Sequence, residues 1–289
     1  MSTYINPALA SAGSRLGPGA LTSAIVNEIR KGLQFAWSER AQILIELPMF
    51  AAFVLLLGPL IGQADQIATG TTTWRLDSET TSVMVVWFVP FSFFYMQVVK
   101  MFWRLLAEIQ AGTIEQVFLS PLPSWLVVAT GRVVAALIET TFVAAATFGI
   151  VSLFVPLSID WSLAALVPLA AGVVAAIGVS LGVAGATLVW KRVQLVNDTL
   201  MVVVMLFSAS ALPLIAVPDW WATVGRFLPL TDVVGGLHLT LLADQSLTAW
   251  GTGGYLPLLL VSVTYLLAGI GAFTLGERTA KRRGTLGRY

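Results

Sequence analysis

The sequence has no cysteine, a single histidine and little charge, with 11% of its 289 residues being Asp, Glu, Lys or Arg. The lack of cysteine excludes disulfides, thiolate chemistry and cysteine-ligated zinc. Because His238 is the only histidine, neither a metal site nor a catalytic acid–base pair is expected. Soluble domains carry about 25% charged residues, so a chain with this few cannot cover a water-exposed surface.

Other absences limit the function further. The run G-x-x-x-x-G-K-[ST], with which a P-loop holds the phosphates of ATP, does not occur in the chain. The net charge of +1 gives no indication of a nucleic-acid partner. The first 20 residues lack the apolar core of a signal peptide, so a cleaved leader is not expected.

Hydrophobic residues are abundant instead, at 57% of the chain, with a mean hydropathy of +0.86. A helix that crosses a bilayer needs about 20 mostly apolar residues. We therefore predict an all-α integral membrane protein whose transmembrane helices lie at six places: 41–61, 82–99, 125–155, 163–190, 193–217 and 255–275.

The distribution of Lys and Arg predicts the orientation. All but two of the 16 basic residues fall in the N-terminus, the second–third loop, the fourth–fifth loop and the C-terminus, and the exceptions are Arg75 and Arg226. Since basic residues collect on the cytoplasmic side, both termini are expected there. The domain organisation follows: a flexible N-terminus (1–21), an amphipathic helix (22–38), a six-span membrane domain (39–276) and a basic tail (277–289).

The stretch before the first span is patterned as a helix with an apolar face that carries Ile25, Ile29, Leu33 and Trp37. Such a helix fits the inner membrane interface, because its apolar face enters the lipid and its polar face stays in water. An ordinary helix docked on the rest of the protein is the alternative.

A short segment between the second and third spans, AGTIEQVFLSPLP, has its own start and stop signals. Thr113 and Gln116 have the spacing of a capping box. Ile114, Val117 and Phe118 fall on one helical face, and the Ser-Pro pair at 120–121 ends the helix. An apolar face on a short cytoplasmic helix indicates burial in a partner's groove.

This segment resembles the cytoplasmic gate and coupling segment of ABC-2 type transporter permeases, the membrane subunits of bacterial drug, polysaccharide and lipid-linked glycan exporters. The matching residues are Gly112, Thr113, Ile114, Glu115, Leu119, Ser120 and Pro121. Pro229, Leu230 and Thr231 resemble a second family segment in the last outer loop, although Phe227 and Leu228 before them depart from the family pattern. The six-span layout is similar too.

The resemblance implies a permease subunit of an ATP-driven exporter in the bacterial cytoplasmic membrane, with no enzymatic activity of its own. It would move an amphipathic or lipid-like substrate or a drug. ATP and Mg would be bound by two partner ABC ATPase subunits, and a second permease subunit, identical or different, would complete the complex. A short coupling helix would dock on the ATPase through Gly112, Thr113, Ile114, Glu115, Gln116, Val117, Phe118, Leu119, Ser120 and Pro121.

The loop between the fifth and sixth spans, residues 218–254, is long and contains apolar runs too short to cross a membrane. It is expected to form a re-entrant hairpin that dips into the outer side and returns. The alternative is an interfacial loop held by Trp220, Trp221 and Trp250 as part of an aromatic belt. In the family, this region caps the outer end of the pathway.

Candidates for lining a substrate route come from the second and fifth spans, which approach the two-fold axis in the family. They are Phe91, Tyr95, Met201 and Met205.

Acidic residues near or within the spans deserve separate interpretation because charge there is costly. Glu46 and Asp198 are expected to be solvated or to pair with basic residues at 40, 191 or 192. Glu139 lies deeper and is interpreted as a packing residue that hydrogen-bonds to nearby threonines. A proton-coupled secondary transporter that uses Glu139 is the alternative function. The Gly178-x-x-x-Gly182 spacing, with Gly185, indicates close helix packing.

Overall fold

The computed structural model describes residues 18–63, 70, 76–113, 124–190, 193–208, 218–250 and 254–283, and the regular elements within these ranges are all helical. In chain order they are α2 (Pro18–Ser38), α3 (Arg40–Gly62), α5 (Ser78–Gln110), α7 (Ser124–Phe154), the 3-10 helix η2 (Leu163–Ala165), α8 (Leu166–Val189), α9 (Gln194–Ser208), α10 (Asp219–Gly225), α11 (Pro229–Leu241) and α12 (Tyr255–Arg283). Helices suit a lipid environment because each satisfies its backbone hydrogen bonds internally.

Five of the predicted spans have a helix that is long and apolar enough to cross a membrane: α3, α5, α7, the joined η2–α8 segment and α12. The chain is therefore a multi-pass membrane protein. For the predicted fifth span the structure has α9, which is 15 residues long, whereas about 20 are needed. Residues 209–217 of that span lie outside the described ranges, so the count of six stays a prediction.

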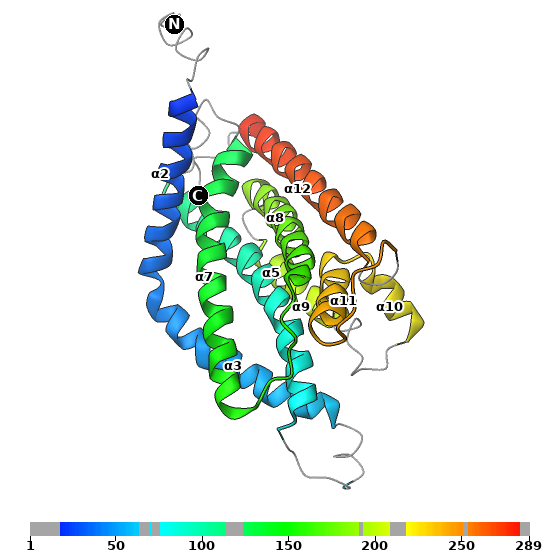
Figure 1. The fold of residues 1–289 in the computed structure, drawn as a ribbon. Helices are drawn as coiled ribbons and strands as arrows, with labels where there is room; N and C mark the ends of the chain where they lie inside the picture. The colour runs from blue at the N-terminus through cyan, green and yellow to red at the C-terminus, as the bar shows by residue number, and fades with distance from the viewer. Residues whose placement is uncertain are drawn as a thin grey trace, which may run out of the picture.

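Helix α5 is the centre of the bundle. It is 33 residues long, and 83% of its most apolar stretch is buried, compared with 28% in α3 and 22% in α12. Figure 1 shows α5 running between α7 on one side and α8 on the other, with α2 and α3 along α7 and with α12 against α8. The outer helices therefore leave much of their apolar surface for lipid, which explains why the chain needs so few charges.

Glycines allow α8 and α12 to approach backbone to backbone. A Cβ atom on Gly269 would collide with the backbone of Gly178, and one on Gly276 would collide with the backbone of Gly185. A Cβ on Gly182 would meet nothing within 4 Å. Close packing at this part of the sequence is confirmed, but it uses a seven-residue spacing on both helices rather than the Gly178–Gly182 pair.

The predicted amphipathic helix is α2, which begins at Pro18, four residues before the expected start. It packs on α7 through a second glycine contact, because a Cβ on Gly131 would lie 2.6 Å from the carbonyl oxygen of Glu28. Leu33 and Trp37, from the predicted apolar face, remain exposed. The helix is thus docked on protein by one face, and it keeps an apolar face available to lipid.

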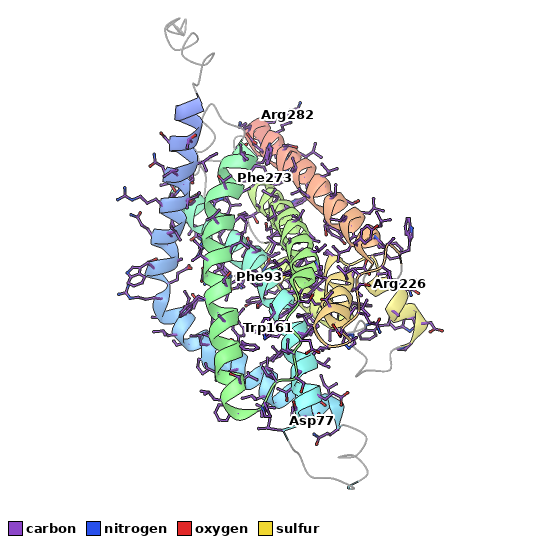
Figure 2. All side chains as sticks on the ribbon, viewed as in Figure 1. Asp77, Phe93, Trp161, Arg226, Phe273 and Arg282 are labelled. Carbon is purple, nitrogen blue, oxygen red and sulfur yellow. The ribbon has the colours of Figure 1, made fainter. Side chains whose placement is uncertain are left out.

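The ends of the bundle differ in charge. Helix α12 continues to Arg283 and finishes with Lys281, Arg282 and Arg283, so the first part of the predicted basic tail is helical. Arg282 lies close to the start of α7 in Figure 2, and Asp77, at the start of α5, lies at the far end. We call the end at which α5 finishes and α7 begins the basic end.

At the opposite end, Asp77 caps the N-terminus of α5. Its carboxylate accepts hydrogen bonds of 2.9 Å from the backbone amide and the hydroxyl of Thr80. The hydrogen bond from the Thr80 amide holds the pKa of Asp77 below its ordinary value, against the opposing effect of partial burial. The charged cap therefore stabilises the protein above the unfolded pKa, and this contribution is lost as the pH falls through the lower, folded pKa.

We expect Asp77→Ala to lower the free energy of unfolding by about 1 kcal/mol at neutral pH, because a helix cap is lost. Asp77→Asn is the matched control, since an asparagine side chain can accept the same hydrogen bond without titrating. Thermal unfolding of the detergent-purified chain, followed from neutral to acid pH, measures both effects. The loss in free energy of unfolding caused by Asp77→Ala should become smaller at acid pH. A loss that stays the same there would contradict a charged cap.

Candidate functional site

The 112–121 segment, which the sequence singles out, begins where α5 ends in a tight backbone turn. Gly112 has φ +70°, a left-handed conformation that favours glycine. The amide of Thr113 donates to the carbonyl of Glu108 at 3.0 Å, and the amide of Gly112 donates to the carbonyl of Ile109 at 3.2 Å. These two bonds form a Schellman motif, so the glycine sets the direction in which the chain leaves α5.

Only the first two residues of this segment, Gly112 and Thr113, are described. The Thr113 hydroxyl donates to the carbonyl of Glu108 at 3.3 Å, so the side chain contacts the helix before it. Residues 114–121, which include the predicted capping partner Gln116 and the predicted docking face, lie outside the part of the chain that the structure describes. The coupling helix therefore stays a prediction.

The same Glu108 that holds the turn also anchors two neighbouring helices through its side chain. One carboxylate oxygen lies 2.8 Å from the Lys31 ammonium of α2, and the other accepts a hydrogen bond from the Arg132 guanidinium of α7. Glu108 and Arg132 are both buried. The end of α5 is thus tied to α2 and α7 immediately before the 112–121 segment begins.

A second group of charges lies one to two turns earlier on α5. The Arg104 guanidinium lies 2.8 Å from a carboxylate oxygen of Glu139 on α7 and 2.8 Å from one of Glu39. The Lys100 ammonium lies 3.0 Å from Glu139 and 3.4 Å from Glu39. Glu39 is the residue between α2 and α3, so this group fixes the junction of those two helices against the middle of the bundle.

Together these residues form what we call the ionic cluster: Lys31, Glu39, Lys100, Arg104, Glu108, Arg132 and Glu139. Most of its members are buried, and burying charges is expensive unless they are paired. Since paired buried charges fix geometry more than they add stability, the cluster holds α2, α5 and α7 in one arrangement at the basic end. In Figure 1 these three helices lie close together there.

The ionic cluster corrects two interpretations of the sequence. The predicted loop between the second and third spans includes Lys100 and Arg104, but both lie within α5 and are buried, and Arg132 is buried within α7. Glu139 forms ion pairs rather than hydrogen bonds to threonine, because the hydroxyl of Thr140 donates to its own helix at Ala136. The signal in the sequence was the four-residue spacing of Lys100, Arg104 and Glu108, which places all three on one helical face.

The other acidic residues have local partners. Glu46 accepts a hydrogen bond of 2.7 Å from the amide of Gln42, one turn before it on α3; among the described residues it has no ion pair with a basic side chain. Asp198 accepts a bond of 3.3 Å from Asn197. Residues 191 and 192, the expected basic partners, are outside the described ranges.

The four candidates for a substrate route pack within one apolar cluster. Phe91 and Met201 are buried in it, and Tyr95 and Met205 pack against it. The ring of Phe91 lies 6.0 Å from that of Tyr95 and stacks on Trp87 at 5.1 Å. The structure therefore brings α5 and α9 into contact, and both their approach to a two-fold axis and the contact of these residues with a substrate stay predictions.

A cavity of about 550 Å³ lies elsewhere, and the four candidates do not line it. Its walls come from α5, α7, α8, α11 and the segment before η2, and they include Phe93 and Trp161, both labelled in Figure 2. It is lined almost entirely by apolar side chains. The predicted route and this cavity are thus separate features of the bundle.

The predicted outer segment forms two short helices, α10 and α11. Pro229 is the first residue of α11, where proline's fixed φ suits a helix start, and Leu230 and Thr231 follow it, both buried. Helix α11 packs against α5, α8 and α12. A buried helix of 13 residues is too short to cross a bilayer, and whether the whole loop is re-entrant stays a prediction.

The family model described as ABC-2 type transporter matches residues 63–242, which is more than half of the chain. The match includes the whole of α5, the 112–121 segment and α7. A comparison with curated proteins finds no match.

Proposed function

The chain belongs to the ABC-2 type transporter family and is a permease subunit of an ABC transporter, and we propose that it exports an amphipathic or lipid-like substrate or a drug. The proposal places it in the bacterial cytoplasmic membrane with both termini in the cytoplasm. Two partner ABC ATPase subunits would bind ATP and Mg, and a second permease subunit, identical or different, would complete the complex.

The observation that carries the proposal is the position of the 112–121 segment within the matched region. It joins the two long helices α5 and α7 at the basic end, the end that the excess of Lys and Arg assigns to the cytoplasm. A motor protein that binds this segment would act on both helices at once. The ionic cluster directly beside the segment supports this mechanism, because its ion pairs connect α2, α5 and α7.

Motion would be transmitted as follows. ATP-driven closure of the ATPase would shift the 112–121 segment, and the turn at Gly112 would pass this shift to α5. The ion pairs of Glu108 and Glu139 would carry α2 and α7 along. Such a rigid-body rearrangement is one of the standard ways in which packed helices switch between states.

The proton-coupled alternative gains no support from Glu139. A proton-carrying carboxylate must alternate between its charged and neutral forms during the transport cycle. Glu139 is buried and paired with both Lys100 and Arg104, so taking up a proton would leave two buried cations with less countercharge. The ion pairs of Glu139 thus support a role in holding α7 to α5.

The proposed function is tested by pulling down the tagged chain from native membranes. We expect an ABC ATPase to co-purify, and the double change Glu115→Arg with Phe118→Asp to reduce its yield by about tenfold or more, because a charge reversal and a buried polar group each disrupt a docking face. The matched control makes the same two changes at exposed positions of the opposite end, Glu79→Arg with Phe227→Asp, and should keep the ATPase. An unmodified chain that brings down no ATPase would contradict the proposal.

A further inference from the structure

The start of α7, which follows the 112–121 segment, is held by a residue far away in the sequence. The hydroxyl of Ser124, the first residue of α7, donates to a carboxylate oxygen of Glu277 on α12. The other carboxylate oxygen of Glu277 lies 2.5 Å from the ammonium of Lys281, one turn further along α12. Ser124 is buried, and the Glu277 side chain is only 13% exposed. The start of α7 is therefore fixed to α12.

Glu277 occupies a specific place on α12, directly after Gly276. A Cβ on Gly276 would collide with the backbone of Gly185 on α8. The backbone next to Glu277 therefore lies directly against the backbone of α8. Such close packing leaves little room for Glu277 to move without shifting α8 as well.

Other contacts between α7 and the α8–α12 pair are few. One apolar cluster at the basic end includes Ala129 and Val133 of α7 together with Phe273 and Ala280 of α12; Phe273 is labelled in Figure 2. Because this packing is non-directional, the Ser124–Glu277 hydrogen bond adds a directional link between α7 and α12 at this end of the bundle.

The helices on the two sides of the 112–121 segment thus contact different parts of the protein. The end of α5, before the segment, is connected through Glu108 to α2 and α7. The start of α7, after the segment, is connected through Ser124 and Glu277 to α12, which packs on α8. We propose that Glu277 and Ser124 are positioning residues that carry the ATPase-driven shift of the segment to the α8–α12 pair. This assignment rests on the proposed function. It names the residues through which a movement of the ATPase would reach α8 and α12.

The test uses introduced cysteines, which the sequence favours because the chain has none of its own. Tyr255→Cys places one at the start of α12, and Leu76→Cys places one just before α5; both positions are exposed. The rate of labelling with a maleimide is measured on the complex pulled down with its ATPase, with and without Mg-ATP plus vanadate. We expect the trapped state to change the rate at both positions by about fivefold or more, the lower range of coupling between distant sites.

Ser124→Ala is the decisive variant. It removes the hydroxyl but leaves Glu277 paired with Lys281, so the fold should persist. We expect it to retain the ATPase and the labelling change at Leu76→Cys, while the change at Tyr255→Cys falls below about twofold. Glu277→Gln should behave like the unmodified chain, since an amide oxygen still accepts the Ser124 hydrogen bond. Thr279→Ala removes a hydroxyl that donates to the carbonyl of Leu275 within α12 and is the matched control.

The outcomes separate the two proposals. If the ATPase co-purifies and the Tyr255→Cys response survives Ser124→Ala, or never occurs in the unmodified chain, the assignment of Ser124 and Glu277 is overturned and the proposed function stands. If no ATPase co-purifies with the unmodified chain, the proposed function fails and the assignment fails with it.

Discussion

Replacing Gly269 by alanine is expected to destabilise the protein strongly, because the new methyl group has no space. A Cβ at this position would collide with the backbone of Gly178 on α8. Backbone atoms cannot rotate away as a side chain can, so α8 and α12 would have to separate along their contact. Overpacking typically costs about 1–3 kcal/mol, and we expect Gly269→Ala to reach the upper end of this range.

A matched control lies two residues further along the same helix. A Cβ on Gly271 would meet nothing within 4 Å, so Gly271→Ala should be neutral or stabilise the helix by about 0.5–1 kcal/mol, the usual gain when alanine replaces glycine there. Gly178→Ala and Gly182→Ala form the same comparison on α8. Thermal unfolding in one detergent measures all four variants, and equal effects at Gly269 and Gly271 would contradict the backbone contact.

These glycines illustrate how much of the packing could be predicted from the sequence. The small residues of the fourth span indicate a close helix contact, and that contact exists. The partner and the register could not be read from one helix, because they depend on where α12 is placed by the rest of the fold. The matching signal was present in both helices, since Gly178 and Gly185 are seven residues apart and so are Gly269 and Gly276.

The ion pairs of the ionic cluster, in contrast, could not be predicted from the sequence. Hydropathy placed the end of the second span at residue 99, before the first charge, whereas α5 continues to Gln110. A charged residue ends an apolar run in the sequence, but it does not end a helix whose neighbours supply countercharges. Those countercharges come from Glu39 and Glu139, which are distant in the sequence and come close only when α7 and the junction of α2 and α3 lie against α5. Five spans could therefore be located, and the ion pairs between them could not.

Neutralising Glu139 is expected to have the second large effect on stability. Glu139→Gln keeps the size of the side chain but leaves Lys100 and Arg104 with Glu39 as their remaining carboxylate partner. Removing one partner of a buried ion pair costs about 3–5 kcal/mol, because the remaining charge stays buried without compensation. We expect a loss in this range in thermal or denaturant unfolding, whereas Glu79→Gln, at an exposed position of α5, should change stability by less than about 0.5 kcal/mol.

The double variant Glu139→Gln with Arg104→Gln separates pairing from a general effect of the substitution. Two of the Arg104 nitrogens, Nε and Nη1, have no hydrogen-bond partner among the described residues, so Arg104 is only partly compensated even beside Glu139. Removing both charges should therefore recover much of the stability lost by Glu139→Gln alone, and additive losses would contradict the pairing. The same experiment separates the two transport mechanisms. If Glu139 carried protons, the Glu139→Gln variant would keep its stability and lose only transport. If the charge of Glu139 holds α5 to α7, the variant loses stability.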